Sequence, residues 1–176
     1  MTGTQKLKIE DPVVILANGS FPEHSIPLEC VNNSGTMICC DGAVDKLEKY
    51  GETPDFIIGD LDSISQESKL KYGEIIIQDS DQNQNDLYKS LTWCVTRNVT
   101  DVIIIGATGQ REDHTIGNIF RLFEFADSLS LEMITDFGKF TLIKKTAEFK
   151  SFTGQQVSIF LNDLSIKLTT ENLKFS

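Results

Sequence analysis

Short apolar runs alternate with amphipathic stretches along the first 136 residues of the chain. Apolar runs bounded by turn-forming residues are typical of strands that are buried on both faces of a parallel sheet. We predict such strands at 13–17, 36–40, within 54–63, 74–78, 102–105 and 131–135. Helical spacing predicts helices over 43–50, from a cap at Ser63 to about 72, over 86–97 and over 113–128. Strand–helix alternation predicts an α/β domain with a largely parallel, Rossmann-like sheet.

Two segments depart from this alternation. Residues 21–30 contain Pro22 and Pro27, which predict a loop with at most a short helix. After Asp136, apolar and polar residues alternate with no helical stretch between them, which predicts antiparallel β structure. The predicted organisation is therefore an α/β domain over 1–136 and a small β-rich unit over 137–176. The alternating apolar positions are Phe140, Leu142, Val157, Ile159, Leu161, Leu164, Ile166 and Leu168.

Composition narrows the class of protein. The chain has 176 residues, 40% of them hydrophobic, and a net charge of −10, which argues against a nucleic-acid-binding surface. Its four cysteines, Cys30, Cys39, Cys40 and Cys94, lack the paired spacing of a zinc site, so we expect reduced thiols. With no apolar leader and no membrane-length apolar stretch, the expected location is cytoplasmic, with no membrane partner.

Polar residues, most of them aspartates, follow the predicted strands. In an open parallel sheet, ligands bind at the carboxyl ends of the strands, so these residues are expected to share one edge. If the third strand stays extended past Gly59, the side chains of Asp60 and Asp62 point the same way and repel unless a cation lies between them. Several such ends together favour a Mg²⁺ site for a polyphosphate, whereas an isolated Asp-x-Asp is more often a polar turn. The strand-end residues are Asn18, Asp41, Asp60, Asp62, Asp81, Gln82 and Asp86.

The loop after the fifth predicted strand, residues 106–114, has the composition of an anion-binding loop. Gly106 and Gly109 allow backbone amides to approach a phosphate, and Arg111 supplies a forked cation. The loop is not a P-loop, because no Gly-Lys-Ser/Thr follows. Asp113 is either a ligand-binding residue or a helix cap, and His114 either an acid–base group or a positioning residue.

Together these segments resemble thiamine pyrophosphokinases along nearly the whole chain. Similar motifs are Asp41-Gly42-Ala43, the run from Pro54 to Ser63, the run from Asp81 to Asp86 with Asn85 where Thr is usual, Gly106 to His114, and Thr169 to Phe175 with Asn172 where Gly is usual. Members of the family run on past the residue that matches Phe175 to complete a β-sandwich. The resemblance therefore implies a C-terminal partial β-sandwich that is incomplete within these residues or completed by a partner.

The resemblance also implies residue roles. Asp41, Asp60, Asp62 and Asp86 would surround Mg²⁺. Gln82, Arg111 and Asp113 would meet the phosphates of ATP, and Asn18, Asp41 and His114 are further candidates for the ATP site. Thiamine would meet Thr169, Thr170 and Phe175, in a homodimer whose thiamine site draws on both subunits.

The implied reaction is pyrophosphoryl transfer from ATP to thiamine, giving thiamine diphosphate and AMP. Asp62, Asp86 and Arg111 are the candidate catalytic residues, and either Asp62 or Asp86 would accept the hydroxyl proton. The acceptor is thiamine or a related pyrimidine or pterin alcohol. Two alternatives remain open: a haloacid-dehalogenase-like phosphatase with Asp60 as nucleophile, and a catalytically weak protein that binds nucleotide or thiamine.

Overall fold

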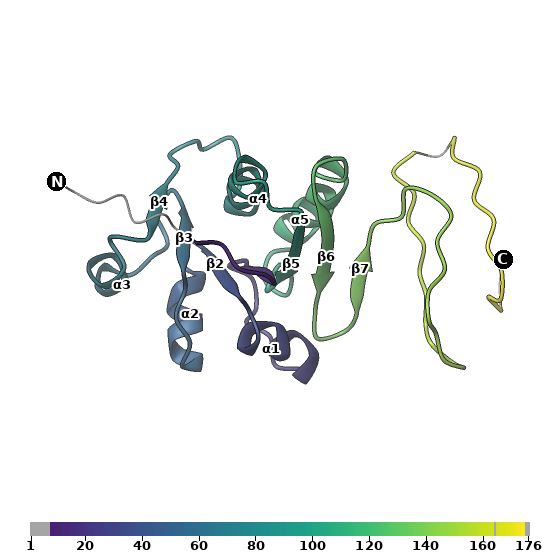
Figure 1. Cartoon of the computed structure of the whole chain (residues 1–176), viewed down its shortest axis with the longest axis horizontal. Coiled ribbons are helices and arrows are strands. Elements are labelled where there is room, and N and C mark those ends of the chain that lie inside the picture. Colours follow the sequence, from purple (N-terminus) through teal and green to yellow (C-terminus); the bar gives the residue numbers. More distant parts are fainter. Residues whose placement is uncertain (1–7, 164, 175–176) are drawn as a thin grey trace. The chain divides into compact units, whose positions relative to one another are not determined.

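The protein, described by a computed structural model over residues 8–163 and 165–174, divides into two units, one ending at Leu142 and one beginning at Ile143. The first contains a seven-stranded sheet in the order β4-β3-β2-β1-β5-β6-β7, with helices on both faces (Figure 1). The strands are β1 (Val13–Leu16), β2 (Thr36–Cys40), β3 (Phe56–Gly59), β4 (Ile76–Gln78), β5 (Asp101–Ile105), β6 (Ser130–Ile134) and β7 (Lys139–Thr141). The helices are α1 (Ser25–Asn32), α2 (Ala43–Tyr50), α3 (Gln66–Lys71), α4 (Asp86–Thr96) and α5 (Glu112–Glu124).

All strand pairs are parallel except β6 with β7. The chain moves outward from β1 to β4 on one side and then returns to place β5 on the other side of β1. The order therefore reverses between β1 and β5, and in open α/β sheets the crevice at such a reversal is a common ligand site. The predicted α/β class with a largely parallel sheet is confirmed.

The core has two layers because successive side chains of each strand point to opposite faces. Val13 and Ile15 of β1 pack in one layer with residues of α4 and α5, and Val14 and Leu16 pack in the other with residues of α1 and α2. Figure 1 shows the same arrangement, with α4 and α5 on one face of the sheet and α1 and α2 on the other. Burial on both faces explains why the strands are apolar without alternation.

The ends of two elements differ from the sequence prediction. Helix α3 is capped by Ser65, whose hydroxyl accepts a hydrogen bond from the Ser68 amide, and not by Ser63. The segment expected to be a loop contains the two-turn helix α1, because Pro27 lies in its first turn, where a missing amide proton costs nothing.

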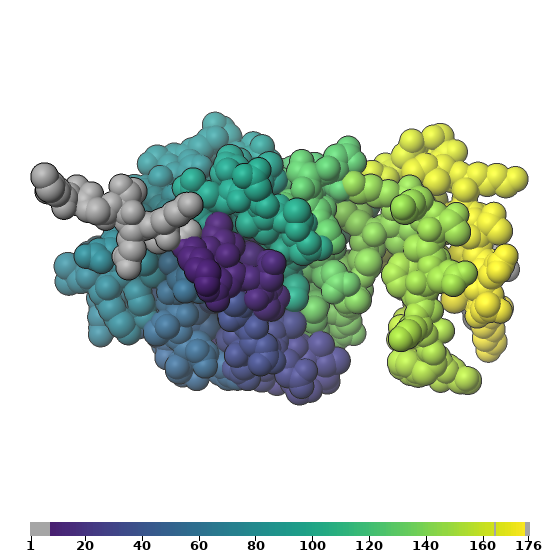
Figure 2. Space-filling model, viewed as in Figure 1, coloured from purple at the N-terminus to yellow at the C-terminus, as the bar shows by residue number. Residues whose placement is uncertain are grey.

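The second unit does not form the expected strands in its described residues. No helix or strand occurs in 143–163 or 165–174, and Leu164 lies outside the described residues. Apolar side chains such as Val157, Phe160 and Leu168 are 53%, 75% and 48% exposed. Figure 2 shows these segments, coloured lime to yellow, as thin runs of side chains. An alternating strand needs a partner and a covered face to be stable, and these residues lack both.

The boundary between the units also differs from the predicted one after Asp136. Strand β7 pairs with β6, with Phe140 opposite Met133, and therefore belongs to the first unit. None of the described helices has the length and apolar character needed to cross a membrane.

Candidate active site

Three carboxylates converge at the carboxyl ends of β2 and β3. Asp41 follows β2, Asp60 follows β3, and Asp86 opens α4, which packs against both strands. One oxygen from each lies within 4.8 Å of the others. Asp41 is buried, and Asp60 and Asp86 are half-buried. The predicted convergence of strand-end aspartates thus holds for these three.

Gly59 makes this convergence possible. A Cβ at this position would lie 2.9 Å from Asp41 Cβ and 3.1 Å from Asp86 Cγ. The contact with Asp41 Cβ is too close for a real side chain and the contact with Asp86 is tight, so the two carboxylates approach each other across a residue that has no side chain.

Asp41 has the geometry of a residue prepared to bind a cation. Its backbone is in the left-handed region, with φ of 41°. Oδ2 accepts a hydrogen bond from the Ser63 amide at 2.9 Å, while Oδ1 is buried and has no hydrogen-bond partner among the described residues. An unpaired buried acceptor is costly, and a metal ion at this point would satisfy it.

Burial raises the pKa of Asp41 to about 6, and the negative charges of Asp86 and Asp62 act in the same direction against the Ser63 hydrogen bond. Burial also raises the pKa of Asp86, although the ammonium of Lys89 opposes this. These two carboxylates are ionised at a cost in the metal-free protein, which is the electrostatic condition that favours a cation.

The backbone turns between Asp60 and Asp62. Leu61 has a φ of 69°, so the extended geometry ends at Asp60 and the chain turns back. The Asp62 amide donates to Asp60 Oδ1 at 3.2 Å, and the exposed Asp62 carboxylate accepts the Ser63 hydroxyl at 2.7 Å. The extended geometry on which that expectation depended is therefore absent, but the Asp62 carboxylate still lies close enough to shift the pKa values of Asp60 and Asp41. Asp62 is not one of the three residues whose oxygens all lie within 4.8 Å of one another.

The side chain of Gln82 also contacts this cluster. Gln82 donates from Nε2 to Asp60 Oδ2 at 2.8 Å, which places one predicted nucleotide-binding residue at the site. Although burial raises the pKa of Asp60, the hydrogen bonds from Asp62 and Gln82 and the charge of Lys89 together lower it. Asp81 is exposed and bonds instead to Asn83 in its own loop.

Lys89 is the residue of this site that the sequence reasoning missed. Its side chain is 3% exposed, and Nζ lies 3.2 Å from Asp86 Oδ1. Lysine is almost never fully buried without a partner. The spacing i, i+3 from Asp86 on an otherwise apolar helix face was the available indication, because it places both side chains on one side of α4.

Asn18 lies beside the cluster at the end of β1. Lys46 Nζ donates to the Asn18 side-chain oxygen at 2.8 Å and to the Gly19 carbonyl at 2.6 Å. A Cβ on Gly42, next to Asp41, would lie 3.0 Å from Asn18 Nδ2. The segment that follows β1 therefore lies next to the segment that carries Asp41.

The loop after β5 presents Arg111 and Asp113 as an exposed ion pair. The guanidinium forms two hydrogen bonds to the carboxylate, at 3.1 and 2.6 Å. Arg111 holds the pKa of Asp113 at about 2. Arg111 is the N-cap residue of α5, Asp113 and the exposed His114 lie in its first turn, and none of the three belongs to the carboxylate cluster.

The predicted thiamine residues lie in the second unit. Thr169 is exposed, Thr170 is half-buried, and Phe175 lies outside the described residues. Their role in holding thiamine stays a prediction.

Comparison with known proteins points to one family. Residues 28–134 match the family model described as thiamin pyrophosphokinase, catalytic domain. The chain is 28% identical over 126 residues to thiamin pyrophosphokinase 1 of Caenorhabditis elegans, covering 66% of this chain and 51% of that protein. It is 35% identical over 104 residues to thiamine pyrophosphokinase 1 of Oryza sativa, covering 53% and 39%. The chain spans about half the length of the curated relatives it matches.

Solved structures agree with this match. The fold is similar to thiamine pyrophosphokinase from Bacillus subtilis, with a TM-score of 0.59 and 23% identity over 69% of this chain and 59% of that one. It is also similar to a probable thiamine pyrophosphokinase from Staphylococcus saprophyticus, with a TM-score of 0.57 and 27% identity over 70% and 65%. These matches favour this family over the haloacid-dehalogenase alternative.

Proposed function

Because the chain belongs to the thiamin pyrophosphokinase family, we propose that it transfers a pyrophosphoryl group from ATP to the hydroxyl group of thiamine, giving thiamine diphosphate and AMP. The observation that carries this proposal is the convergence of Asp41, Asp60 and Asp86 around the unpartnered buried oxygen of Asp41. Asp41, Asp60 and Asp86 all lie inside the matched catalytic domain.

The donor set fits Mg²⁺, which prefers carboxylate oxygens and substrate phosphates. Asp41, Asp60 and Asp86 would hold the ion, with Asp62 as the adjacent fourth carboxylate proposed for it. When bound, Mg²⁺ supplies positive charge that offsets the charge on the phosphates. Gln82 orients Asp60 through its 2.8 Å hydrogen bond, and Lys89 holds Asp86.

The remaining candidate residues supply anion binding and a proton acceptor. Arg111 would exchange its bond to Asp113 for phosphate oxygens, which a guanidinium binds with the same forked geometry. Asp113, His114 and Asn18 are proposed to complete the nucleotide site. Asp62 is a better candidate than Asp86 for accepting the thiamine hydroxyl proton, because it is exposed and free of the Lys89 ion pair.

The proposed enzyme is a cytoplasmic homodimer. The free cysteines, of which Cys39, Cys40 and Cys94 are buried, support a reducing compartment. The exposed apolar residues of the second unit support association with another chain, because they have no cover in the described residues. The proposed partners are thiamine and ATP, with no nucleic acid and no membrane.

The test is AMP release from Mg-ATP with and without thiamine. We expect AMP formation only with thiamine, and its loss in Asp62→Asn and Asp60→Asn. Glu52→Gln is the matched control, because it removes an exposed carboxylate from the loop before β3 and leaves the cluster intact. Release of free phosphate in place of AMP would indicate hydrolysis, and ATP binding without turnover would indicate a binding protein.

A further inference from the structure

Asn118 of α5 is a buried polar side chain to which the proposed reaction gives no role. It is 9% exposed, although Ile116 and Phe120, two positions to either side of it, are each 56% exposed. A buried side-chain amide is costly unless both of its ends are hydrogen-bonded. Asn118 Oδ1 accepts a hydrogen bond from Asn85 Nδ2 at 3.0 Å, and Asn118 Nδ2 donates to the Ala107 carbonyl at 2.9 Å. One side chain therefore joins two segments that are distant in sequence.

The first of these segments is the start of α4, which carries part of the carboxylate cluster. Asn85 is the N-cap residue of α4, and its Oδ1 accepts a hydrogen bond from the Tyr88 amide at 2.9 Å. Asp86 is the next residue and contributes one oxygen to the cluster. Asn85 thus caps the helix with one end of its amide and bonds to Asn118 with the other. The position of Asn118 is therefore linked to that of Asp86.

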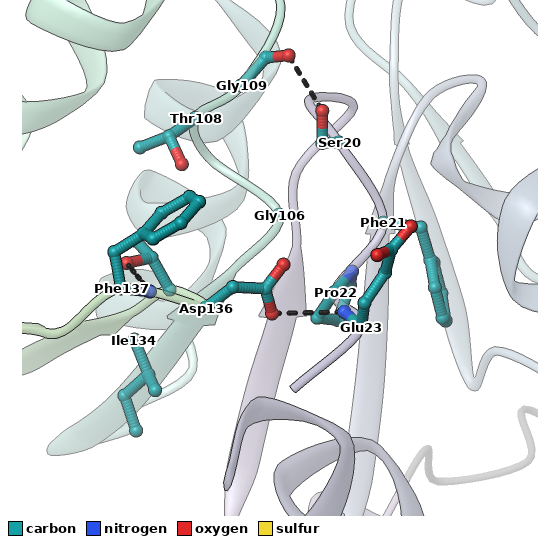
Figure 3. Close-up of a pocket in the computed structure, with 11 residues that line it drawn as sticks. Ser20, Phe21, Pro22, Glu23, Gly106, Thr108, Gly109, Ile134, Asp136 and Phe137 are labelled. Carbon is teal, nitrogen blue, oxygen red and sulfur yellow. Dashed lines mark hydrogen bonds between the residues drawn. The ribbon is translucent and has the colours of Figure 1, made fainter. Parts of the chain in front are cut away.

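The second segment is the loop after β5, which leads to Arg111. One side of this loop is bonded to the segment after β1, because the Ser20 hydroxyl donates to the Gly109 carbonyl at 2.7 Å (Figure 3). Asn118 bonds to the same loop at Ala107, which is buried. The loop is therefore held by two separate elements before it reaches Arg111.

Aromatic contacts join α4 to α5 independently of Asn118. The Arg121 guanidinium lies 4.9 Å from the centre of the Tyr88 ring, and the Tyr88 and Phe125 rings are 5.2 Å apart. Both α5 residues lie on the C-terminal side of Asn118, whereas Asn85 lies beside the carboxylate cluster. Loss of the Asn118 hydrogen bonds should therefore change the spacing at the site without separating the two helices.

We propose that Asn118 is a positioning residue, which sets the spacing between the carboxylate cluster and Arg111 so that both contact the same polyphosphate. Groups on two separate segments can act on one substrate only if the segments keep a fixed distance. Asn118 bonds directly to the residue before Asp86 and to the loop that leads to Arg111. This proposal rests on the proposed function only in taking a polyphosphate as the ligand.

The test is calorimetric binding of two probes to the full chain, Mg²⁺ alone and tripolyphosphate in excess Mg²⁺. Asn118→Leu keeps a side chain of similar size but forms neither hydrogen bond. We expect Mg²⁺ affinity to stay within about twofold, because the cluster is intact, and tripolyphosphate affinity to fall about tenfold, because Arg111 is no longer held in place. Asn118→Ala leaves room for water beside the freed polar groups and should show the same difference between the probes, including where the leucine variant does not fold.

A double-mutant cycle tests whether Asn118 acts through Arg111. In an Arg111→Ala background, Asn118→Leu should lower tripolyphosphate affinity by less than about twofold, because the group that Asn118 positions is gone. A tenfold loss in both backgrounds would show that the two residues act independently and would overturn the proposal.

Two further variants separate positioning from a loss of stability. Leu122→Ala, one turn further along α5, removes a core side chain and keeps both hydrogen bonds. It should lower the melting temperature at least as far as Asn118→Leu does and leave tripolyphosphate affinity within about twofold. Asn85→Thr should also keep that affinity, because a hydroxyl group can accept from the Tyr88 amide and donate to Asn118.

Three results would contradict the positioning role. These are equal losses of tripolyphosphate affinity in Leu122→Ala and Asn118→Leu, a tenfold loss in Asn85→Thr, and a wild-type chain that does not bind tripolyphosphate with Mg²⁺. If the affinities follow the expectation but thiamine yields no AMP, the proposed reaction is wrong and the positioning role of Asn118 remains.

Discussion

The two units of this chain differ in how far their apolar residues are buried. In the first unit, Ile15 and its neighbours on the central strands are fully buried between two layers of helices. In the second unit, residues of the same type, such as Ile159 and Phe160, are 44% and 75% exposed. Apolar runs that form parallel strands find their partners within the same unit, whereas alternating segments need a second layer to cover one face. The carboxylate cluster belongs to the self-contained unit.

The largest expected effect comes from a matched pair of isoleucine substitutions, one in the core and one at an exposed position. Ile15→Ala removes a fully buried side chain and should lower the free energy of unfolding by about 2–5 kcal/mol. Ile159→Ala makes the same change at an exposed position and should cost less than about 0.5 kcal/mol. Urea unfolding of both variants measures the difference. Equal losses would mean that Ile159 is buried in solution, against a partner chain or within a folded second unit.

The second prediction concerns the pH dependence of the first unit. The pKa of Asp41 is about 6 in the folded protein against 3.8 ordinarily. Between these values the folded state holds a proton that the unfolded state has released, so stability is highest below pH 4 for this group and falls as pH rises to 6. The expected loss is at most about 3 kcal/mol.

Urea unfolding in a chelating buffer at pH 4.5 and pH 7 tests this, with Asp41→Asn as the reference that removes the titration. The variant should show a smaller loss between the two pH values than the wild type. Saturating Mg²⁺ should reverse the trend, because the ion favours the ionised carboxylate. A wild type and variant with the same pH dependence would contradict the assignment to Asp41.

The third prediction tests whether Gly59 is needed both for Mg²⁺ binding at the carboxylate cluster and for the stability of the first unit. Gly59→Ala introduces a Cβ 2.9 Å from that of Asp41, so we expect a loss of about 1–3 kcal/mol in stability and weaker Mg²⁺ binding. Gly117→Ala is the control, because a Cβ there meets nothing within 4 Å and the helix α5 should gain stability. Calorimetric titration with Mg²⁺ and thermal unfolding give both readouts. Unchanged Mg²⁺ affinity in Gly59→Ala would separate the metal site from these carboxylates.

The smallest expected change in stability comes from ending the chain at Leu142. Because the second unit contributes no buried core among its described residues, the melting temperature should shift by less than about 4 °C. Mg-ATP binding should persist, and thiamine-dependent AMP formation should be lost. A shortened chain that still uses thiamine would show that Thr169 and Thr170 are not needed for the acceptor.

Much of the first unit could be predicted because its elements are determined locally. An apolar run that ends in aspartate indicates both a buried strand and a polar strand end, and Asp41 and Asp60 follow from that rule alone. The positive φ of Leu61 could not be predicted, since neither glycine nor asparagine occupies the position, and it ends the extended geometry between Asp60 and Asp62. The contacts of Asp136 were also missed, because its Oδ1 accepts hydrogen bonds from the amides of Glu23 and His24, which are distant in sequence.

The second unit shows that alternation of apolar and polar residues does not by itself predict a strand. Alternation at 157–168 predicts strands only if another layer covers the apolar face, and the pattern itself does not supply that layer. The prediction that Ser63 caps α3 was wrong for a local reason. Ser63 and Ser65 are both suitable caps, but the Ser63 amide and hydroxyl are already engaged with Asp41 and Asp62.

The buried ammonium of Lys89 has a consequence for the affinity of the proposed Mg²⁺ site. Three carboxylates alone would present three negative charges to a divalent cation, and affinity rises with the number of charged ligands. Lys89 subtracts one of those charges at Asp86 from a position where solvent cannot screen it. The Lys89 ammonium therefore offsets part of the negative charge that a bound metal ion would otherwise offset. If Mg²⁺ binds here as proposed, it would be held less tightly than by three unpaired carboxylates, and it would bind and leave together with the nucleotide phosphates.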